Sequence, residues 1–179
     1  MLTTIFDNSK VFKTLCLLAI LAFPLTLHAL PAHVHGKAQL QVAIEGNEIH
    51  LDFDSPLGNL LDFEHNPKND QQRQAVKAMT EKLHHPETLF VMTKAAACVV
   101  KSVNLLLPPA LLGSRNQTAA HADLEAEILF FCANSAALNT IEVQLFKAFP
   151  LLQHLQAEIV TEKGQSVIAL RPESTVLTW

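Results

Sequence analysis

The stretch that decides the fold is residues 39–54, QLQVAIEGNEIHLDFD. Apolar and polar residues alternate on both sides of Gly46-Asn47, a pattern typical of a hairpin with a two-residue turn. Pairing across this turn predicts one apolar face, formed by Leu40 with Phe53, Val42 with Leu51, and Ile44 with Ile49. The opposite face carries Gln39 with Asp54, Gln41 with Asp52, and Ala43 with His50. Both strands therefore agree about the buried side, which specifies the register.

The rest of the chain predicts one substantial helix and further strands. Asn69 can cap a helix whose Ala75, Val76, Met79 and Leu83 fall at helical spacing, and His84-His85-Pro86 ends it. Strands are predicted over residues 88–92, 96–107 and 121–132, with a loop over 108–120 and a strand or short helix over 141–149. Residues 155–170 predict a second hairpin about Lys163-Gly164, with Ile159 opposite Ile168. The fold class is α+β, a single domain of antiparallel β-hairpins.

Composition and the first 29 residues bear on the compartment. With 13 basic and 17 acidic residues among 179, the net charge of −4 argues against a general nucleic-acid or anionic-membrane binder. Lys10 and Lys13 precede an uncharged run over 14–27, which is typical of a secretory signal peptide cleaved after Ala29 or Ala32. A transmembrane anchor is the alternative, but this run falls short of the ~20 residues that span a bilayer. We expect residues 1–29 to be a signal peptide and 30–179 one exported domain with no further membrane span.

Cys16 lies in the predicted signal peptide, and export predicts that the other two cysteines form a disulfide. Thiols pair in an oxidising compartment, and a connection centred near Arg115 sets Cys98 opposite Cys132. A metal site built on these two cysteines is the alternative, but it requires further ligands close by in the strands.

No catalytic motif stands out. The chain has no glycine-rich phosphate loop, no GxSxG and no HExxH, so we expect that it is not an enzyme. Histidines beside carboxylates are the remaining chemical signal. His33 and His35, two apart on an extended chain, point the same way and can reach one metal ion. The hairpin register extends to place His35 opposite Gly58.

Further candidate ligands follow in the sequence. Asp62, Glu64 and His65 leave the second strand close to the predicted position of His35, and His121 shares a strand face with Asp123. His50 is excluded because its partner Ala43 lies ~26 Å along the strand from His35. The plain alternative is that all these histidines are solvated surface residues.

The same residues carry a resemblance to a known family. The stretches HVHGKAQL (33–40), SPLGNLLDFEH (55–65), HADL (121–124) and LFKAFP (145–150) resemble signatures of the ZrgA-type periplasmic proteins of Gram-negative bacteria. The resemblance covers essentially the whole chain after the signal peptide. It implies a periplasmic protein that binds zinc and supports a periplasmic or inner-membrane zinc transporter component. The expected zinc ligands are His33, His35, His65 and His121, with Glu64 and Asp123 as supporting or direct carboxylates.

One departure from the family limits this implication. Many members carry a long His/Asp/Glu-rich stretch between the middle strands, where this chain has PPALLGSR (108–115) with no ligand side chain. A single structured site is therefore expected, rather than capture of several ions. Two hypotheses stand: a periplasmic zinc-binding accessory protein, and a periplasmic structural or interaction module that has lost metal binding.

Overall fold

The structure is a computed structural model that describes residues 35–112 and 122–179. The predicted signal peptide, residues 1–29, and two predicted ligands, His33 and His121, lie outside these ranges. The strands are β1 Lys37–Glu45, β2 Glu48–Pro56, β3 Phe90–Met92, β4 Cys98–Leu106, β5 Asp123–Cys132, β6 Thr140–Val143, β7 His154–Thr161, β8 Gly164–Leu170 and β9 Val176–Thr178. The helices are α2 Leu57–Leu61, α3 Asp70–Leu83, α4 Pro86–Leu89 and α5 Leu145–Ala148, with 3₁₀ turns η2 Lys94–Ala96, η3 Pro109–Leu111 and η4 Ser135–Ala137.

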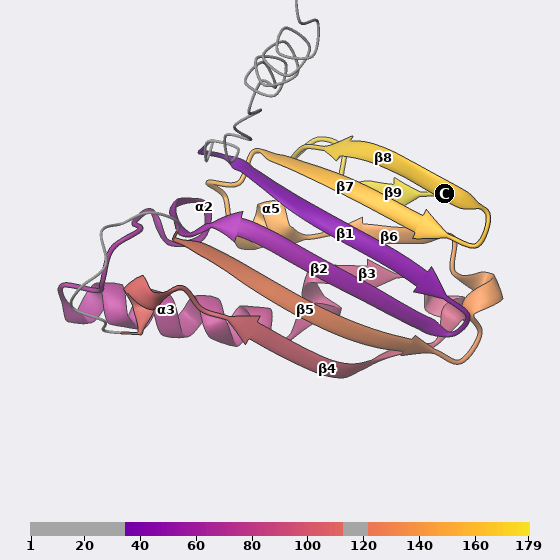
Figure 1. The fold of residues 1–179 in the computed structure, drawn as a ribbon, viewed down its shortest axis with the longest axis horizontal. Helices are drawn as coiled ribbons and strands as arrows, with labels where there is room; N and C mark the ends of the chain where they lie inside the picture. The colour runs from indigo at the N-terminus through magenta and orange to yellow at the C-terminus, as the bar shows by residue number, and fades with distance from the viewer. Residues whose placement is uncertain (1–34, 113–121) are drawn as a thin grey trace, which may run out of the picture. The chain divides into compact units, whose positions relative to one another are not determined.

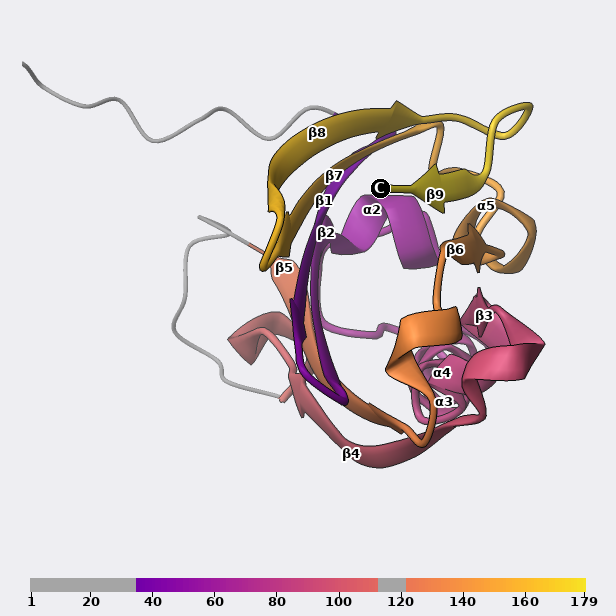
Figure 2. The ribbon, with the colours of Figure 1, turned by 90° about the vertical axis from the view of Figure 1, so that its right-hand side faces the viewer.

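Two sheets enclose the core (Figure 1). The larger has six strands in the order β4-β5-β2-β1-β7-β8, and the smaller has the order β3-β6-β9. The larger sheet is strongly curved, and α2, α3 and the smaller sheet lie on its concave side (Figure 2). Along β1 and β2 buried and exposed residues alternate, which gives the sheet one dry and one wet face. The predicted α+β fold, mostly sheet with one substantial helix, is confirmed.

The β1–β2 hairpin has the predicted register throughout. Leu40 pairs with Phe53, Val42 with Leu51, and Gln41 with Asp52. The apolar members of these pairs are at most 1% exposed and form the centre of the core. Gly46 has a φ of +58°, which a side chain at the turn would disfavour.

The helix α3 also begins where predicted. The Asn69 side chain accepts a hydrogen bond from the backbone N–H of Gln72 at 2.9 Å, and the helix ends at Leu83. Its Met79 and Leu83 are buried, while Ala75 and Val76 are half-buried. None of the helices in the described ranges is long and apolar enough to cross a membrane.

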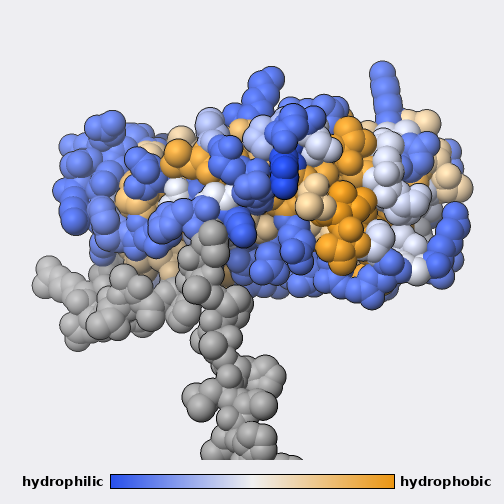
Figure 3. All heavy atoms as spheres, turned by 90° about the horizontal axis from the view of Figure 1, so that it is seen from above, coloured by the Kyte–Doolittle hydropathy of each residue, from blue (hydrophilic) through white to orange (hydrophobic). Residues whose placement is uncertain are grey.

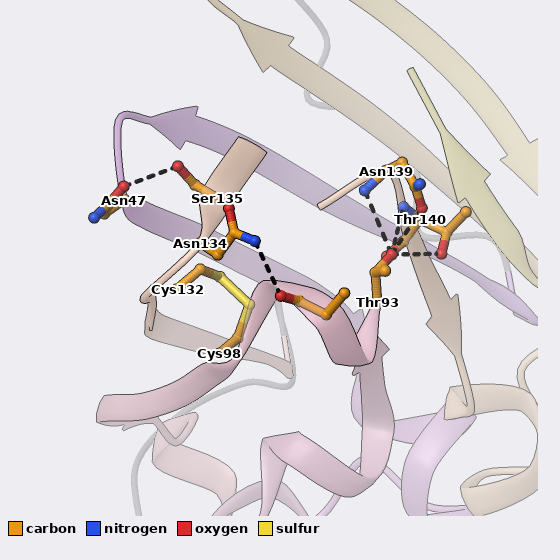
Figure 4. Close-up of a disulfide and its surroundings, with 9 residues drawn as sticks. Asn47, Thr93, Cys98, Cys132, Asn134, Ser135, Asn139 and Thr140 are labelled. Atoms are coloured by element: carbon orange, nitrogen blue, oxygen red, sulfur yellow. Dashed lines mark hydrogen bonds between the residues drawn. A yellow bond between two sulfur atoms is a disulfide. The ribbon is translucent and has the colours of Figure 1, made fainter. Parts of the chain in front are cut away.

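The disulfide is confirmed, because Cys98 and Cys132 are bonded (Figure 4). It joins the first residue of β4 to the last residue of β5, where the antiparallel register places the two cysteines opposite each other. The bond closes a loop with a sequence separation of 34 residues, for which chain entropy gives about 4 kcal/mol of stabilisation. Beyond Val100 the β4 register shifts at a bulge before Ser102.

Three details differ from the sequence-based expectation. The second hairpin is β7–β8, but its turn is Glu162-Lys163, and Ile159 pairs with Ser166 rather than with Ile168. Thr161 is the reason, because its Oγ1 accepts from the Lys163 N–H and stabilises the earlier turn. Pro86 starts the short helix α4, so the strand expected from residue 88 begins only at Phe90. The parallel pairing of β1 with β7 was not predicted.

Candidate functional site

The backbone just before β1 is held by hydrogen bonds to the residues at the start of β7. The Gly36 carbonyl accepts hydrogen bonds from the backbone N–H groups of Gln153 and His154, both at 2.8 Å. Gly36 has a φ of +81°, a conformation that glycine adopts without steric cost. This turn directs the chain into the parallel β1–β7 ladder, which starts with Lys37 opposite His154.

Asn59 ties the same segment to the helix α2. Its Oδ1 accepts from the Gly36 N–H at 2.6 Å, and its Nδ2 donates to the Lys37 carbonyl at 2.7 Å. A third bond runs from Nδ2 to Ser55 Oγ at 3.2 Å. Asn59 is 1% exposed, so these bonds satisfy an amide that burial would otherwise penalise. The backbone beside His35 is thereby fixed over α2.

His35 and Glu64 both lie against Gly58. A Cβ built on Gly58 would lie 2.9 Å from Glu64 Oε1 and 3.4 Å from His35 Cδ2. The Gly58 N–H also donates to Glu64 Oε1 at 3.4 Å. An imidazole and a carboxylate from segments far apart in sequence therefore share the space that any larger residue at position 58 would fill. The expected proximity of His35 to Gly58 is confirmed, but the hairpin register does not extend to it, because β2 ends at Pro56 and Gly58 lies in the helix α2.

His65 lies next to this pair in sequence and is half-buried. Its ring stacks on Phe63 with 5.2 Å between the centroids, and its Nδ1 lies 2.9 Å from the Asn66 carbonyl oxygen. Because a carbonyl oxygen only accepts, Nδ1 carries the proton in that bond, and Nε2 of the neutral ring keeps its lone pair. In this tautomer Nε2 is the ring nitrogen that could bind a metal ion.

The chain returns to α2 at the start of β5. The Ala122 carbonyl accepts from the Leu57 N–H at 2.9 Å, and Asp123 is the register partner of Pro56. Asp123 is thus positioned beside the N-terminus of α2, while Asp62 is exposed at the C-terminus of that helix. Across residues 35–112 and 122–179, no group of three His, Cys, Asp or Glu side chains is arranged to hold a metal ion. His33 and His121 lie outside these ranges.

An acidic ladder on the outer face of the larger sheet was not predicted. Asp52 faces Glu127 and Asp54 faces Glu125 on the adjacent strands β2 and β5. Burial, together with the charge of Glu127, raises the pKa of Asp52 above its ordinary value. Burial, followed by the charges of Asp52, Glu127 and Asp54, raises the pKa of Glu125.

A depression lies beside this ladder. It measures about 370 Å³ and includes His50, Asp52, Asn104 and Glu127 in its lining. Asn104 Nδ2 donates to Glu127 Oε2 at 2.8 Å, while Asp52 Oδ1 is buried without a hydrogen-bond partner among the residues that the structure describes. The period-two acidic residues at 52, 54, 125 and 127 were the available sequence signal, but the β2–β5 pairing needed to join them is not local. Gly58 was expected only as the position opposite His35, and Asn59, which was not predicted, carried no signal beyond its place in a family-like motif.

Comparison with known proteins identifies the family of this chain. A sequence model of the ZrgA family of zinc uptake proteins matches residues 32–179, so the chain belongs to that family. This match includes β1, α2 and β5, which position the residues around Gly58. A search of curated proteins gave no match.

Proposed function

We propose, from the membership of this chain in the ZrgA family of zinc uptake proteins, that it is a periplasmic zinc-binding accessory protein without enzymatic activity. In this proposal it binds zinc as cargo and passes it to a zinc transporter component. The observation that carries the proposal is that His35 and Glu64 both lie against Gly58. The apolar segment over residues 14–27 and the Cys98–Cys132 disulfide support an oxidising compartment.

The chemistry of the donor atoms fits zinc. Imidazole nitrogen and carboxylate oxygen are both zinc ligands, and structural sites usually have four. His35 and His65 supply two imidazoles from the described part of the chain, and we assign the other two ligands to His33 and His121. Glu64 and Asp123 are carboxylates that ligate directly or hold an imidazole in the correct tautomer. Soft thiolate ligation is excluded at Cys98 and Cys132, because both sulfurs are in the disulfide.

Gly58 and Asn59 position the side chains of His35 and Glu64 in the proposed site. Gly58 leaves room for the two ligand side chains, and Asn59 holds the backbone on either side of the Gly36-Lys37 bond. Neither residue touches the ion in this proposal. Each acts by keeping His35 and Glu64 at a distance that one metal ion can bridge.

Calorimetric titration of zinc into the purified mature protein tests the proposal. Replacing both His33→Ala and His35→Ala is expected to weaken zinc binding by at least ~10-fold. His50→Ala is the matched control, because His50 is exposed on the outer sheet face beside Glu48 and is expected to leave the affinity unchanged. Affinity should also fall as the pH drops through ~6.5, since protons compete for the imidazoles.

A second variant separates ligand loss from ligand positioning. Gly58→Ala keeps every ligand but places a methyl group 2.9 Å from Glu64 Oε1, so the carboxylate must move and zinc affinity should fall. If the parent binds no zinc, the protein is a metal-free structural or interaction module. If the parent and the double histidine variant bind zinc equally well, the N-terminal histidines are not ligands.

A further inference from the structure

The chain that follows α2 is folded back against that helix. Asp62 has a φ of +65°, a left-handed conformation at the end of the helix, and its N–H donates to the Gly58 carbonyl at 3.3 Å. Further along, Glu64 lies against Gly58. This reversal holds the backbone around Phe63 and His65, and it leaves the orientation of the His65 ring to side-chain contacts.

Two contacts of different kinds restrain the imidazole of His65. At the ring edge, Nδ1 lies 2.9 Å from the Asn66 carbonyl oxygen. On the ring face, Phe63 stacks with its centroid 5.2 Å away and an angle of 29° between the two planes. A hydrogen bond to one atom restrains the plane of the ring only weakly, because the χ2 torsion of histidine is broad. The stack on Phe63 supplies the restraint that the hydrogen bond lacks.

Phe63 is neither a core residue nor an exposed one. It is half-buried, and it is not among the partly buried apolar residues that pack against the core of the described chain. Large exposed apolar residues lie elsewhere, for instance Val160 on β7 and Val167 on β8. Figure 3, viewed from the side on which β7 and β8 lie in Figure 1, shows an apolar patch among hydrophilic surroundings. Phe63 differs from both groups, because the contact that distinguishes it is the stack on His65.

We propose that Phe63 is a positioning residue of the zinc site. Its ring keeps the His65 imidazole in place, so that Nδ1 stays bonded to the Asn66 carbonyl and Nε2 stays available to the ion. This inference rests on the proposed function, because it takes His65 as a zinc ligand. Phe63 does not touch the ion; it orders the ligand before the ion arrives, which lowers the entropy lost on binding. Residues that orient a metal ligand change metal affinity by roughly 10- to 100-fold.

Nuclear magnetic resonance of the metal-free protein tests the orientation of the ring. The ¹⁵N shifts of His65, recorded at about pH 8 where imidazoles are neutral, report which nitrogen carries the proton. We expect the proton on Nδ1 in the parent and a mixture of both tautomers in Phe63→Leu, which keeps an apolar side chain but has no flat ring. Phe63→Tyr keeps the flat ring and should keep the parental tautomer. A parental ring protonated mainly on Nε2 would overturn the proposal, as would a Phe63→Leu protein that keeps the parental tautomer.

Calorimetric titration of zinc into the mature protein tests the effect on binding. Phe63→Leu should raise the dissociation constant roughly 10-fold, and Phe63→Tyr should leave it near the parental value. Phe131→Leu is the matched control. Phe131 is also half-buried and absent from the core contacts of the described residues, and it lies near the opposite end of β5 from Asp123. Its replacement should change neither the His65 tautomer nor the zinc affinity.

A double variant separates positioning from a general structural effect. If Phe63 acts through His65, adding Phe63→Leu to His65→Ala should leave the dissociation constant of the His65→Ala protein unchanged. A further loss of affinity in the double variant would overturn the proposal and leave the proposed function intact. Parental affinity in either Phe63→Leu or His65→Ala would do the same. A parent that binds no zinc would instead refute the proposed function, and this inference with it.

Discussion

Removing the Asn59 side chain should both destabilise the protein and weaken zinc binding. Asn59→Ala deletes three hydrogen bonds, to the Gly36 N–H, the Lys37 carbonyl and Ser55 Oγ. At about 1 kcal/mol for each bond, the free energy of unfolding should fall by about 3 kcal/mol. For a domain of this size that loss lowers the melting temperature by roughly 6–12 °C. His35 would lose the anchor beside it, so zinc affinity should fall as well.

Thermal unfolding followed by circular dichroism, with and without zinc, measures both effects. Asn104→Ala is the control, because this exposed amide makes one hydrogen bond, to Glu127, and its loss should cost less than about 1 kcal/mol. The zinc-induced rise in melting temperature should be smaller in the Asn59 variant than in the Asn104 variant. Equal stability of the two variants would refute the role of Asn59 as a buried anchor.

Three further predictions follow from the core, the acidic ladder and the disulfide. Phe53→Ala should lower the free energy of unfolding in urea by roughly 3–5 kcal/mol, whereas the exposed Gln41→Ala should change it little; equal losses would mean that the register is wrong. Asp52→Asn should stabilise the protein by roughly 0.2–1 kcal/mol at pH 7, because it removes a carboxylate opposite Glu127. Because the pKa of Asp52 is raised, the ionised carboxylate destabilises the folded state at neutral pH, and this penalty disappears as the pH falls through that pKa. The stability gained by Asp52→Asn should therefore be smaller at pH 4 than at pH 7 in urea denaturation, and an equal gain at both pH values would contradict this reasoning. Replacing Cys98 and Cys132 with Ser should lower the free energy of unfolding by roughly 2–5 kcal/mol. If the variant is as stable as the parent, and reductant leaves the melting temperature of the parent unchanged, the bond does not stabilise the fold.

The elements that local pattern specifies were predictable. The β1–β2 hairpin combines strict alternation with a Gly46-Asn47 turn, so its register could be derived from sixteen residues. The Asn69 cap was predictable because it is local, and the Cys98–Cys132 pairing was predictable because it follows from a single antiparallel connection. The β7–β8 register predicted around Lys163-Gly164 is wrong by two residues, because Gly164 is the first residue of β8 and lies outside the turn.

Pairings between distant strands left no comparable signal. The parallel β1–β7 ladder and the β2–β5 ladder join segments that lie far apart in the sequence, and alternation alone does not choose a partner. The proximity of His35 to Gly58 could therefore be predicted from the sequence, but the buried hydrogen bonds of Asn59 could not. The acidic ladder was missed for the same reason, since Asp52 and Glu127 become neighbours only when β2 meets β5.

The central claim is that zinc binds beside Gly58, where His35 and Glu64 lie, and nuclear magnetic resonance tests it most directly. Zinc would be titrated into protein labelled with ¹⁵N while the imidazole nitrogen signals are recorded for each histidine. The account predicts that a ring nitrogen of His35 shifts with zinc occupancy, while the signals of His50 stay in place. Saturable zinc binding that leaves the His35 ring signals unchanged would contradict it.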